Sequence, residues 1–157
     1  GPDRYKNVQE TIQAVSQLDG VSLLVMGGNR ETSELGAQLL GSRYSHAMVP
    51  HDRMPEICNC ADVFTLASES SEAFGIVYVE AMACNLPVVA TDDELRREIV
   101  GPAGVFVKDV RDPAAYAAVL KAALEEDWGN RPRRRAEKFG WAEIARQYEN
   151  EFSKLSS

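Results

Sequence analysis

The sequence lacks any apolar run long enough to cross a membrane. None of its 157 residues lies in an uninterrupted stretch approaching the roughly 20 apolar residues of a membrane-spanning helix. The first four residues, Gly-Pro-Asp-Arg, do not resemble a signal peptide. Internal repeats and low-complexity segments are also absent. The length and the ordinary composition instead predict one compact globular domain.

Cysteine and positive charge are both scarce. The three cysteines, Cys58, Cys60 and Cys84, are an odd number, and their spacing matches no common disulfide framework or zinc site. We therefore expect reduced thiols in a cytoplasmic protein, with peripheral attachment at the inner face of the membrane as a further option. The net charge of −7 argues against a nucleic-acid partner, because nucleic-acid binding needs a basic face. The net charge does not exclude a phosphate ligand that is bound by local hydrogen-bond donors.

Short apolar runs alternate with segments of helical periodicity along the chain. The expected strands are 21–26, 47–49, 62–66, 86–90 and 105–107. The expected helices are 8–18, 31–40, 55–60, 74–84, 92–99 and a helical tail that begins at Asp112-Pro113. This order predicts an α/β fold: a Rossmann-like, doubly wound parallel sheet with helices on both faces.

Ligands of such sheets bind outside the carboxyl ends of the strands, where the strand order reverses. The loops after Met26, Val49, Leu66 and Ala90 are therefore the candidate binding loops. The chain starts just before a helix, without the strand that should precede it. We expect this first, central strand to lie upstream of residue 1 in the parent protein.

The most informative stretch is 68–84, which leaves one strand and enters a helix. The N–H groups of a first helical turn can bind a phosphate or sugar hydroxyls, and Gly75 lets the backbone approach a ligand closely. Glu72 precedes this turn, and Glu80 lies about two turns further on with its side chain leaning back. Both carboxylates can then face one cleft. From spacing alone, a dipole-stabilising Glu72 and a solvated Glu80 remain the alternative.

The sequence 72–90, Glu-Ala-Phe-Gly-Ile-Val-Tyr-Val-Glu-Ala-Met-Ala-Cys-Asn-Leu-Pro-Val-Val-Ala, resembles the signature of the family-4 retaining glycosyltransferases. The hallmark of that family is Glu, seven residues, Glu, then Ala-Met-Ala and Gly-x-Pro-Val-Val-Ala. Further similar segments are Lys6-Asn7, 61–64 with Ser68, Glu98-Ile99-Val100 with Gly104, and Phe139-Gly140-Trp141 with Tyr148. The resemblance covers nearly the whole chain.

The resemblance implies a GT-B enzyme, in which two Rossmann-like lobes face each other. Residues 1–157 are then the C-terminal donor-binding domain, and the N-terminal acceptor domain lies outside them. The donor is a nucleoside-diphosphate sugar, and the acceptor is a hydroxyl of a sugar, a lipid or another compound. Cations and a helix terminus replace a metal at the leaving diphosphate, so no metal or other cofactor is expected. The isolated chain should be inactive.

By resemblance, Glu72 is the catalytic residue, which contacts the donor sugar and supports the reacting centre, and Glu80 binds the ribose. Lys6 neutralises the diphosphate, and Arg4 is the nearest match to an arginine that the family carries further upstream. The remaining contacts to the nucleotide sugar are main-chain ones. They come from Phe74, Gly75 and Ile76 for the sugar and phosphates, and from Val49 to His51 for the base.

Two further departures from the family pattern affect turns. Asn85 replaces a glycine, and asparagine tolerates the left-handed conformation that this turn needs. Residues 93–97, Asp-Glu-Leu-Arg-Arg, stand where the family usually has Gly-Gly, so we expect an altered donor preference. A GT-B phosphorylase, a sugar-nucleotide epimerase and a non-catalytic sugar-nucleotide-binding module remain alternatives to a transferase.

Overall fold

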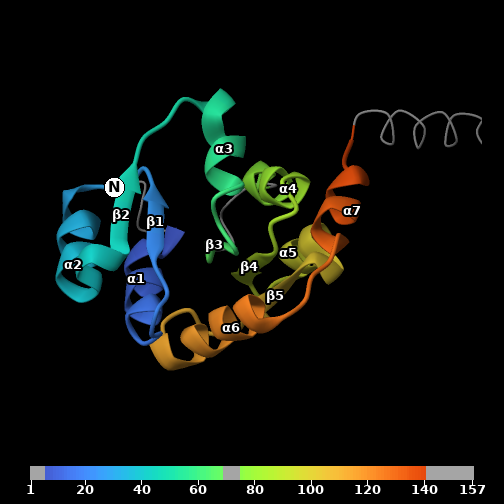
Figure 1. Cartoon of the computed structure of the whole chain (residues 1–157). Helices are drawn as coiled ribbons and strands as arrows, with labels where there is room; N and C mark the ends of the chain where they lie inside the picture. The colour runs from blue at the N-terminus through green and yellow to red at the C-terminus, as the bar shows by residue number, and fades with distance from the viewer. Residues whose placement is uncertain (1–5, 69–74, 141–157) are drawn as a thin grey trace, which may run out of the picture.

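The computed structural model describes residues 6–68 and 75–140. Helices and strands alternate along this part of the chain (Figure 1). The N-terminal elements are α1 (Val8–Ser16), β1 (Leu23–Met26), α2 (Arg30–Leu40), η2 (Gly41–Arg43), β2 (Tyr44–Ala47), η3 (His51–Arg53) and α3 (Met54–Cys58). The C-terminal elements are β3 (Phe64–Leu66), α4 (Ile76–Ala83), β4 (Val88–Thr91), α5 (Glu94–Val100), η4 (Gly101–Ala103), β5 (Gly104–Val107), α6 (Pro113–Glu125) and α7 (Arg131–Glu137).

The strands form two parallel sheets. β1 pairs with β2, and β4 lies between β3 and β5 in the second sheet. Every strand pair is parallel, so each connection within a sheet is a crossover that includes at least one helix. This arrangement confirms the α/β fold with parallel strands that the sequence predicts.

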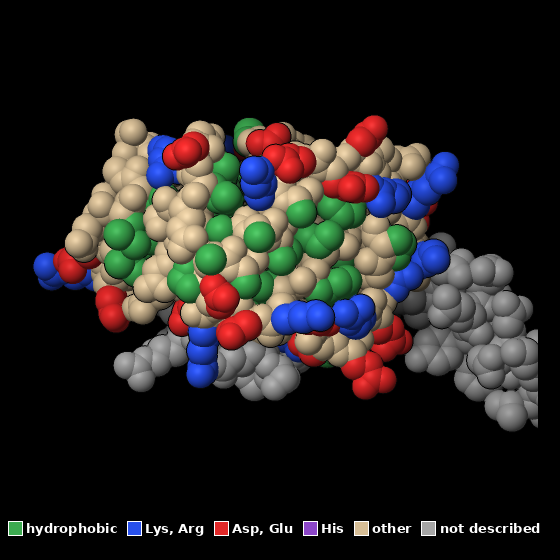
Figure 2. All heavy atoms as spheres, turned by 90° about the horizontal axis from the view of Figure 1, so that it is seen from below, with side chains coloured by type: hydrophobic (Ala, Val, Ile, Leu, Met, Phe, Trp, Pro, Cys, Tyr) green, Lys and Arg blue, Asp and Glu red, His purple; other side chains and the backbone are tan. Residues whose placement is uncertain are grey.

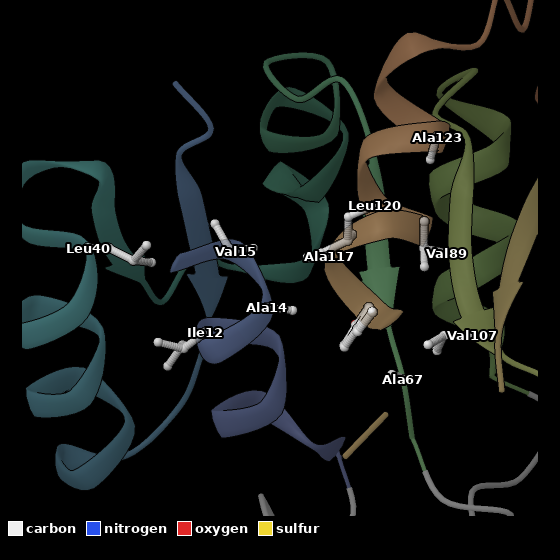
Figure 3. Packing of buried hydrophobic residues seen from close by; sticks show 11 residues of the cluster. Ile12, Ala14, Val15, Leu40, Ala67, Val89, Val107, Ala117, Leu120 and Ala123 are labelled. Carbon is white, nitrogen blue, oxygen red and sulfur yellow. The ribbon is translucent and has the colours of Figure 1, made fainter. Parts of the chain in front are cut away.

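Successive residues of β4 belong to two different hydrophobic clusters. Val88 packs with Tyr78, Met82 and Ile99, which come from α4 and α5. Val89 instead joins the cluster that α1 and α6 complete, and Figure 3 shows it there beside Ala117, Leu120 and Ala123 of α6 and with Ile12, Ala14 and Val15 of α1. Because side chains alternate across a strand, these two clusters lie on opposite faces of the sheet. Helices therefore cover β4 on both sides.

Two cap and turn residues indicated by the sequence lie where we expect them. Asp112 accepts hydrogen bonds from the N–H groups of Ala114 and Ala115, which confirms it as the N-cap of α6. Asn85 has φ = 62°, and its side chain donates to the Gly129 carbonyl at 2.8 Å. The left-handed turn after α4 thus forms with asparagine in the place of glycine.

The strand expected at 47–49 is wrong by three residues, because β2 spans Tyr44–Ala47. Ser45 and His46 are exposed on this strand, so it lacks the apolar run on which the expectation rested. The apolar pair that follows lies in a loop, where Met48 is 87% exposed and Val49 is half-buried. A strand with one neighbour in its sheet can have polar side chains. Such a strand has no apolar run by which the sequence could predict it.

We expect Gly104→Ala to destabilise the domain by about 2–3 kcal/mol, because β4 and β5 leave no room for a methyl group there. A Cβ atom at Gly104 would overlap the main-chain oxygen of Val88 and lie 2.7 Å from Cγ1 of Val100. The melting temperature should fall by roughly 4–12 °C. At Gly140 the nearest atom to a new Cβ is the Glu137 oxygen at 3.3 Å, so Gly140→Ala is the matched control. Equal melting temperatures for the two variants would contradict the packing of β4 against β5.

Candidate functional site

Three consecutive main-chain oxygens at the end of β3 each accept a hydrogen bond from a side chain of a different element. The bonds run from the Tyr78 hydroxyl to Leu66 O (2.8 Å), from Asn7 Nδ2 to Ala67 O (2.5 Å) and from Thr91 Oγ1 to Ser68 O (2.8 Å). They join the carboxyl end of β3 to α4, to the residue before α1 and to the end of β4. This edge of the sheet is where parallel α/β folds bind ligands.

Asn7 determines where Lys6 lies. It is the N-cap of α1 in the left-handed conformation (φ = 49°), and it is buried beside Ala67. Lys6 precedes it directly and is half-buried. The structure therefore places Lys6 one residue before the contact with the loop that follows β3.

The Tyr116 hydroxyl holds α1 against β3. This buried residue of α6 lies 3.1 Å from Thr11 Oγ1 of α1 and 2.6 Å from Thr65 Oγ1 of β3. Burial is the main cause that raises the pKa of Tyr116 above its ordinary value, so the hydroxyl stays protonated at neutral pH. A neutral hydrogen-bonded bridge thus sets the position of the amino end of α1 relative to the strand.

The amino end of α4 is open to solvent. Gly75 caps this helix in the left-handed conformation (φ = 63°), and the first helical residue, Ile76, is 63% exposed. The N–H groups of the first turn of a helix have no partner within the helix, and they carry a partial positive charge. Gly75 and Ile76 thus form the start of the helix that the sequence predicts to bind a phosphate or a sugar.

Glu80 of α4 lies beside His51 of η3. His51 Nε2 is 3.1 Å from Glu80 Oε1, and the exposed fractions of the two side chains are 80% and 32%. The contact brings together two candidate residues that the sequence placed at separate points of the ligand. The loop 48–50 leads directly into His51.

Cys58, at the end of α3, packs beneath this contact. Its pKa is raised mainly by burial, and the neighbouring Cys84 and Glu80 raise it further. All three cysteines are free thiols, and Cys60 is exposed. The burial of Cys58 and its packing near Cys84 show that α3 lies against α4 below the Glu80 carboxylate.

The end of β4 carries an ion pair. Asp92 accepts hydrogen bonds from Arg97 Nε at 2.5 Å and from Arg97 Nη2 at 2.9 Å. The Arg97 guanidinium holds the pKa of Asp92 below its usual range. Among residues 6–68 and 75–140, no three His, Cys, Asp or Glu side chains are grouped as ligands of a metal ion. The negative charge of Asp92 is thus balanced by Arg97.

Three of the candidate residues, Arg4, Glu72 and Phe74, lie outside the described residues. Among the others, Lys6 precedes the residue that bonds Ala67 after β3, Gly75 and Ile76 begin α4, and Glu80 contacts His51, which follows Val49 by two residues. Sequence reasoning gave no role to Tyr78, Thr91 and Arg96, although all three side chains contact Leu66 or Ser68. The signal that could have indicated a buried Arg96 is its helical spacing from the apolar Ile99 and Val100.

Comparison with known proteins identifies the family. The sequence profile described as "Glycosyl transferases group 1" matches residues 3–140. The chain belongs to this family. This group 1 glycosyltransferase chain is 34% identical to the D-inositol 3-phosphate glycosyltransferase of Xylanimonas cellulosilytica, over 85% of the chain and 36% of that protein. It is 30% identical to the alpha-maltose-1-phosphate synthase of Mycolicibacterium smegmatis, over 98% of the chain and 46% of that protein.

A solved structure supports the same assignment. The sucrose-phosphate synthase of Thermosynechococcus elongatus superposes on this glycosyltransferase chain with a TM-score of 0.79 and 27% identity, covering 98% of the chain and 43% of that structure. The chain therefore spans less than half the length of these relatives. Within the described part, no helix has both the length and the apolar character needed to cross a membrane.

We expect a thiol reagent at neutral pH to modify Cys60 much faster than Cys58 in the folded protein. Cys60 is exposed, whereas the raised pKa of Cys58 keeps its thiol protonated, and the thiolate is the reactive form. Mass spectrometry after timed alkylation measures both rates. Denaturant should make the alkylation rates of the two cysteines similar. Equal rates in the native protein would contradict the packing of α3 against α4.

Proposed function

We propose that residues 1–157 form the donor-binding domain of a retaining GT-B glycosyltransferase, which transfers a sugar from a nucleoside diphosphate to a hydroxyl acceptor. The observation that carries this proposal is the contact between Glu80 of α4 and His51. It is supported by the position of Lys6, directly before the Asn7 side chain that bonds Ala67 O after β3. Membership of the group 1 glycosyltransferases supports the reaction class. The arrangement supplies donors for phosphates and an acceptor for a ribose diol.

The donor would lie across the amino end of α4. In this proposal the base contacts the main chain from Val49 to His51, and Glu80 exchanges its contact with His51 for the ribose hydroxyls. The diphosphate lies against the main-chain N–H groups of Gly75 and Ile76 and against Lys6. A carboxylate accepts well from vicinal hydroxyls, and a helix terminus favours an anion, so each pairing is chemically matched.

Residues outside the described part would complete the site. We propose that Glu72 contacts the donor sugar and supports the reacting centre, that the Phe74 main chain joins Gly75 and Ile76, and that Arg4 assists Lys6. The leaving diphosphate gains negative charge in the transition state, and preorganised cations and helix N–H groups lower that barrier without a metal ion. Attack from the face of the leaving group, with the phosphate as base, accounts for retention.

Sheet topology supports the proposal that this domain is part of a larger protein. Within the described residues β1 pairs with β2 and β3 pairs with β4, which leaves one edge of β1 and one edge of β3 without a strand partner (Figure 1). We propose that a strand outside residues 1–157 lies between them and makes one doubly wound sheet. An N-terminal domain would then bind the acceptor, a sugar, lipid or other hydroxyl compound. Residues 1–157 alone would transfer no sugar, because nothing orients the acceptor.

Surface charge and cysteine state agree with a cytoplasmic protein that does not bind nucleic acid. The face shown in Figure 2 carries both acidic and basic side chains around apolar ones. The net charge is −7. The free thiols suit a reducing compartment, and we propose the cytoplasm as its location, with peripheral contact at the inner face of the membrane open to the whole protein.

The proposed donor site predicts stabilisation by nucleoside diphosphates. A ligand at ~100 times its dissociation constant adds ~2.7 kcal/mol to the free energy of unfolding. For a domain of this size, the melting temperature should rise by roughly 5–11 °C. Uridine, guanosine and adenosine diphosphates are tested separately, with the monophosphates and inorganic phosphate as controls. If none of the three shifts a cooperative melting transition at millimolar concentration, the donor site is refuted.

Replacing each glutamate by alanine separates their roles. Glu80→Ala should weaken a nucleoside diphosphate and its sugar derivative alike, by roughly 10- to 150-fold, because both ligands contain the ribose. Glu72→Ala should weaken the sugar derivative alone, and Glu125→Ala on α6, whose side chain is 68% exposed, is the matched control. Calorimetric titration gives the affinities. Equal losses of diphosphate affinity in the Glu72 and Glu80 variants would contradict the assignment.

A further inference from the structure

Arg96 is a charged residue in the hydrophobic interior. Its side chain is 2% exposed, and it is the largest fully buried side chain among the described residues. It lies on the inward face of α5 together with Ile99 and Val100. Its burial favours a role through the groups that it contacts.

The Arg96 guanidinium lies between two loops. Nη2 donates to Ser68 Oγ at 3.1 Å, just after β3, and Nη1 lies 3.1 Å from Asp93 Oδ2, just after β4. Asp93 also accepts the main-chain N–H of Arg96 through Oδ1 at 2.9 Å, as the N-cap of α5. Asp93 thus binds both the main chain and the side chain of Arg96, and the pair joins the start of α5 to the end of β3.

Stability alone does not explain this ion pair. Removing two charges from water is costly, and apolar residues of similar volume often replace a buried pair at no loss of stability. A buried arginine with fixed planar geometry does, however, hold its partners at set distances. Ser68 is also completely buried and contacts the Tyr78 hydroxyl at 3.3 Å, so its position is defined on several sides.

The two loops that Arg96 joins are those at the carboxyl ends of β3 and β4. Residues 93–97 stand where the resembled family usually has Gly-Gly; here Asp93 caps α5 and the other four belong to that helix. A glycine pair leaves the backbone free to adopt many conformations. Here the Asp93–Arg96 ion pair and the Asp93 cap restrict the conformation of this turn.

We propose that Arg96 is a positioning residue that sets the spacing between the ends of β3 and β4, and thereby the fit of the donor sugar. This inference rests on the proposed donor-binding function. Base and ribose are assigned to 49–51 and to Glu80. Lys6 and α4, assigned to the diphosphate, are held at the end of β3 by the Asn7–Ala67 and Tyr78–Leu66 hydrogen bonds, which do not involve Arg96. Its loss should therefore reduce the contribution of the sugar to binding and spare the nucleoside diphosphate.

The test compares two affinities in one variant. Asp93→Asn/Arg96→Met removes both charges, keeps a capping side chain on α5 and fills the buried space with an apolar chain of similar length. Arg131→Met, which breaks the Arg131–Glu126 ion pair on the surface of the C-terminal helices, is the matched control. Calorimetry on the full chain measures binding of the uridine, guanosine and adenosine diphosphates and of their glucose and mannose derivatives.

In the double variant, the ratio of diphosphate to sugar-nucleotide dissociation constants should fall about tenfold, the equivalent of one charged hydrogen bond. Diphosphate affinity should stay within about threefold, and the melting temperature within about 4 °C. Arg96→Lys keeps the charge but not the planar fork, so its ratio should lie between those of the wild type and the double variant. The control should match the wild type.

Two results would overturn the inference while the donor-binding proposal stands. One is an unchanged ratio in both Arg96 variants. The other is an equal loss of affinity for diphosphate and sugar nucleotide together with a lower melting temperature, which would make Arg96 a general structural residue. If the wild-type chain binds none of these ligands, the proposed function fails and the inference fails with it. Should the double variant not fold, the Arg96→Lys ratio decides alone, with a fall supporting the inference.

Discussion

The end of β3 is the point on which the rest of the site depends. Its last carbonyls are bonded in turn to α4, to the residue before α1 and to β4. Each bond is made by a neutral polar side chain at a buried or half-buried position, where a lost partner would cost more than the net worth of the bond. These bonds give a three-residue strand a defined position, and they place the amino ends of two helices at the same edge of the sheet.

Charge at this edge is distributed in a way that suits an anionic ligand. Lys6 and the first turn of α4 supply positive potential on one side, while Glu80 and His51 supply paired polar groups on the other. Asp92, the acidic residue at the end of β4, is held ionised by Arg97 and is therefore compensated within the chain. The carboxylate of Asp92 therefore does not oppose a phosphate with an uncompensated charge.

Local signals in the sequence account for most of the fold. The doubly buried β4 and the Asp112-Pro113 start of α6 follow from an apolar run and a capping pair, and the structure confirms both. The position of β2 was mispredicted because its exposed residues are polar. The contact between His51 and Glu80 joins residues 29 positions apart, and no local pattern encodes it. The burial of Arg96 was not predicted, because arginine is usually a surface residue. Only its helical spacing from apolar residues indicated an inward position.

Mapping of amide chemical shifts by NMR, while a nucleoside diphosphate is titrated into the chain, tests the central claim most directly. The account predicts that the largest shifts gather at Lys6 and Asn7, at 48–51 and at 75–80, all around the carboxyl end of β3. Amides on α7, on the far side of α4 from this edge, should stay unchanged. Saturable shifts centred on α7 or on the β1–β2 sheet, with those around β3 unmoved, would contradict the account.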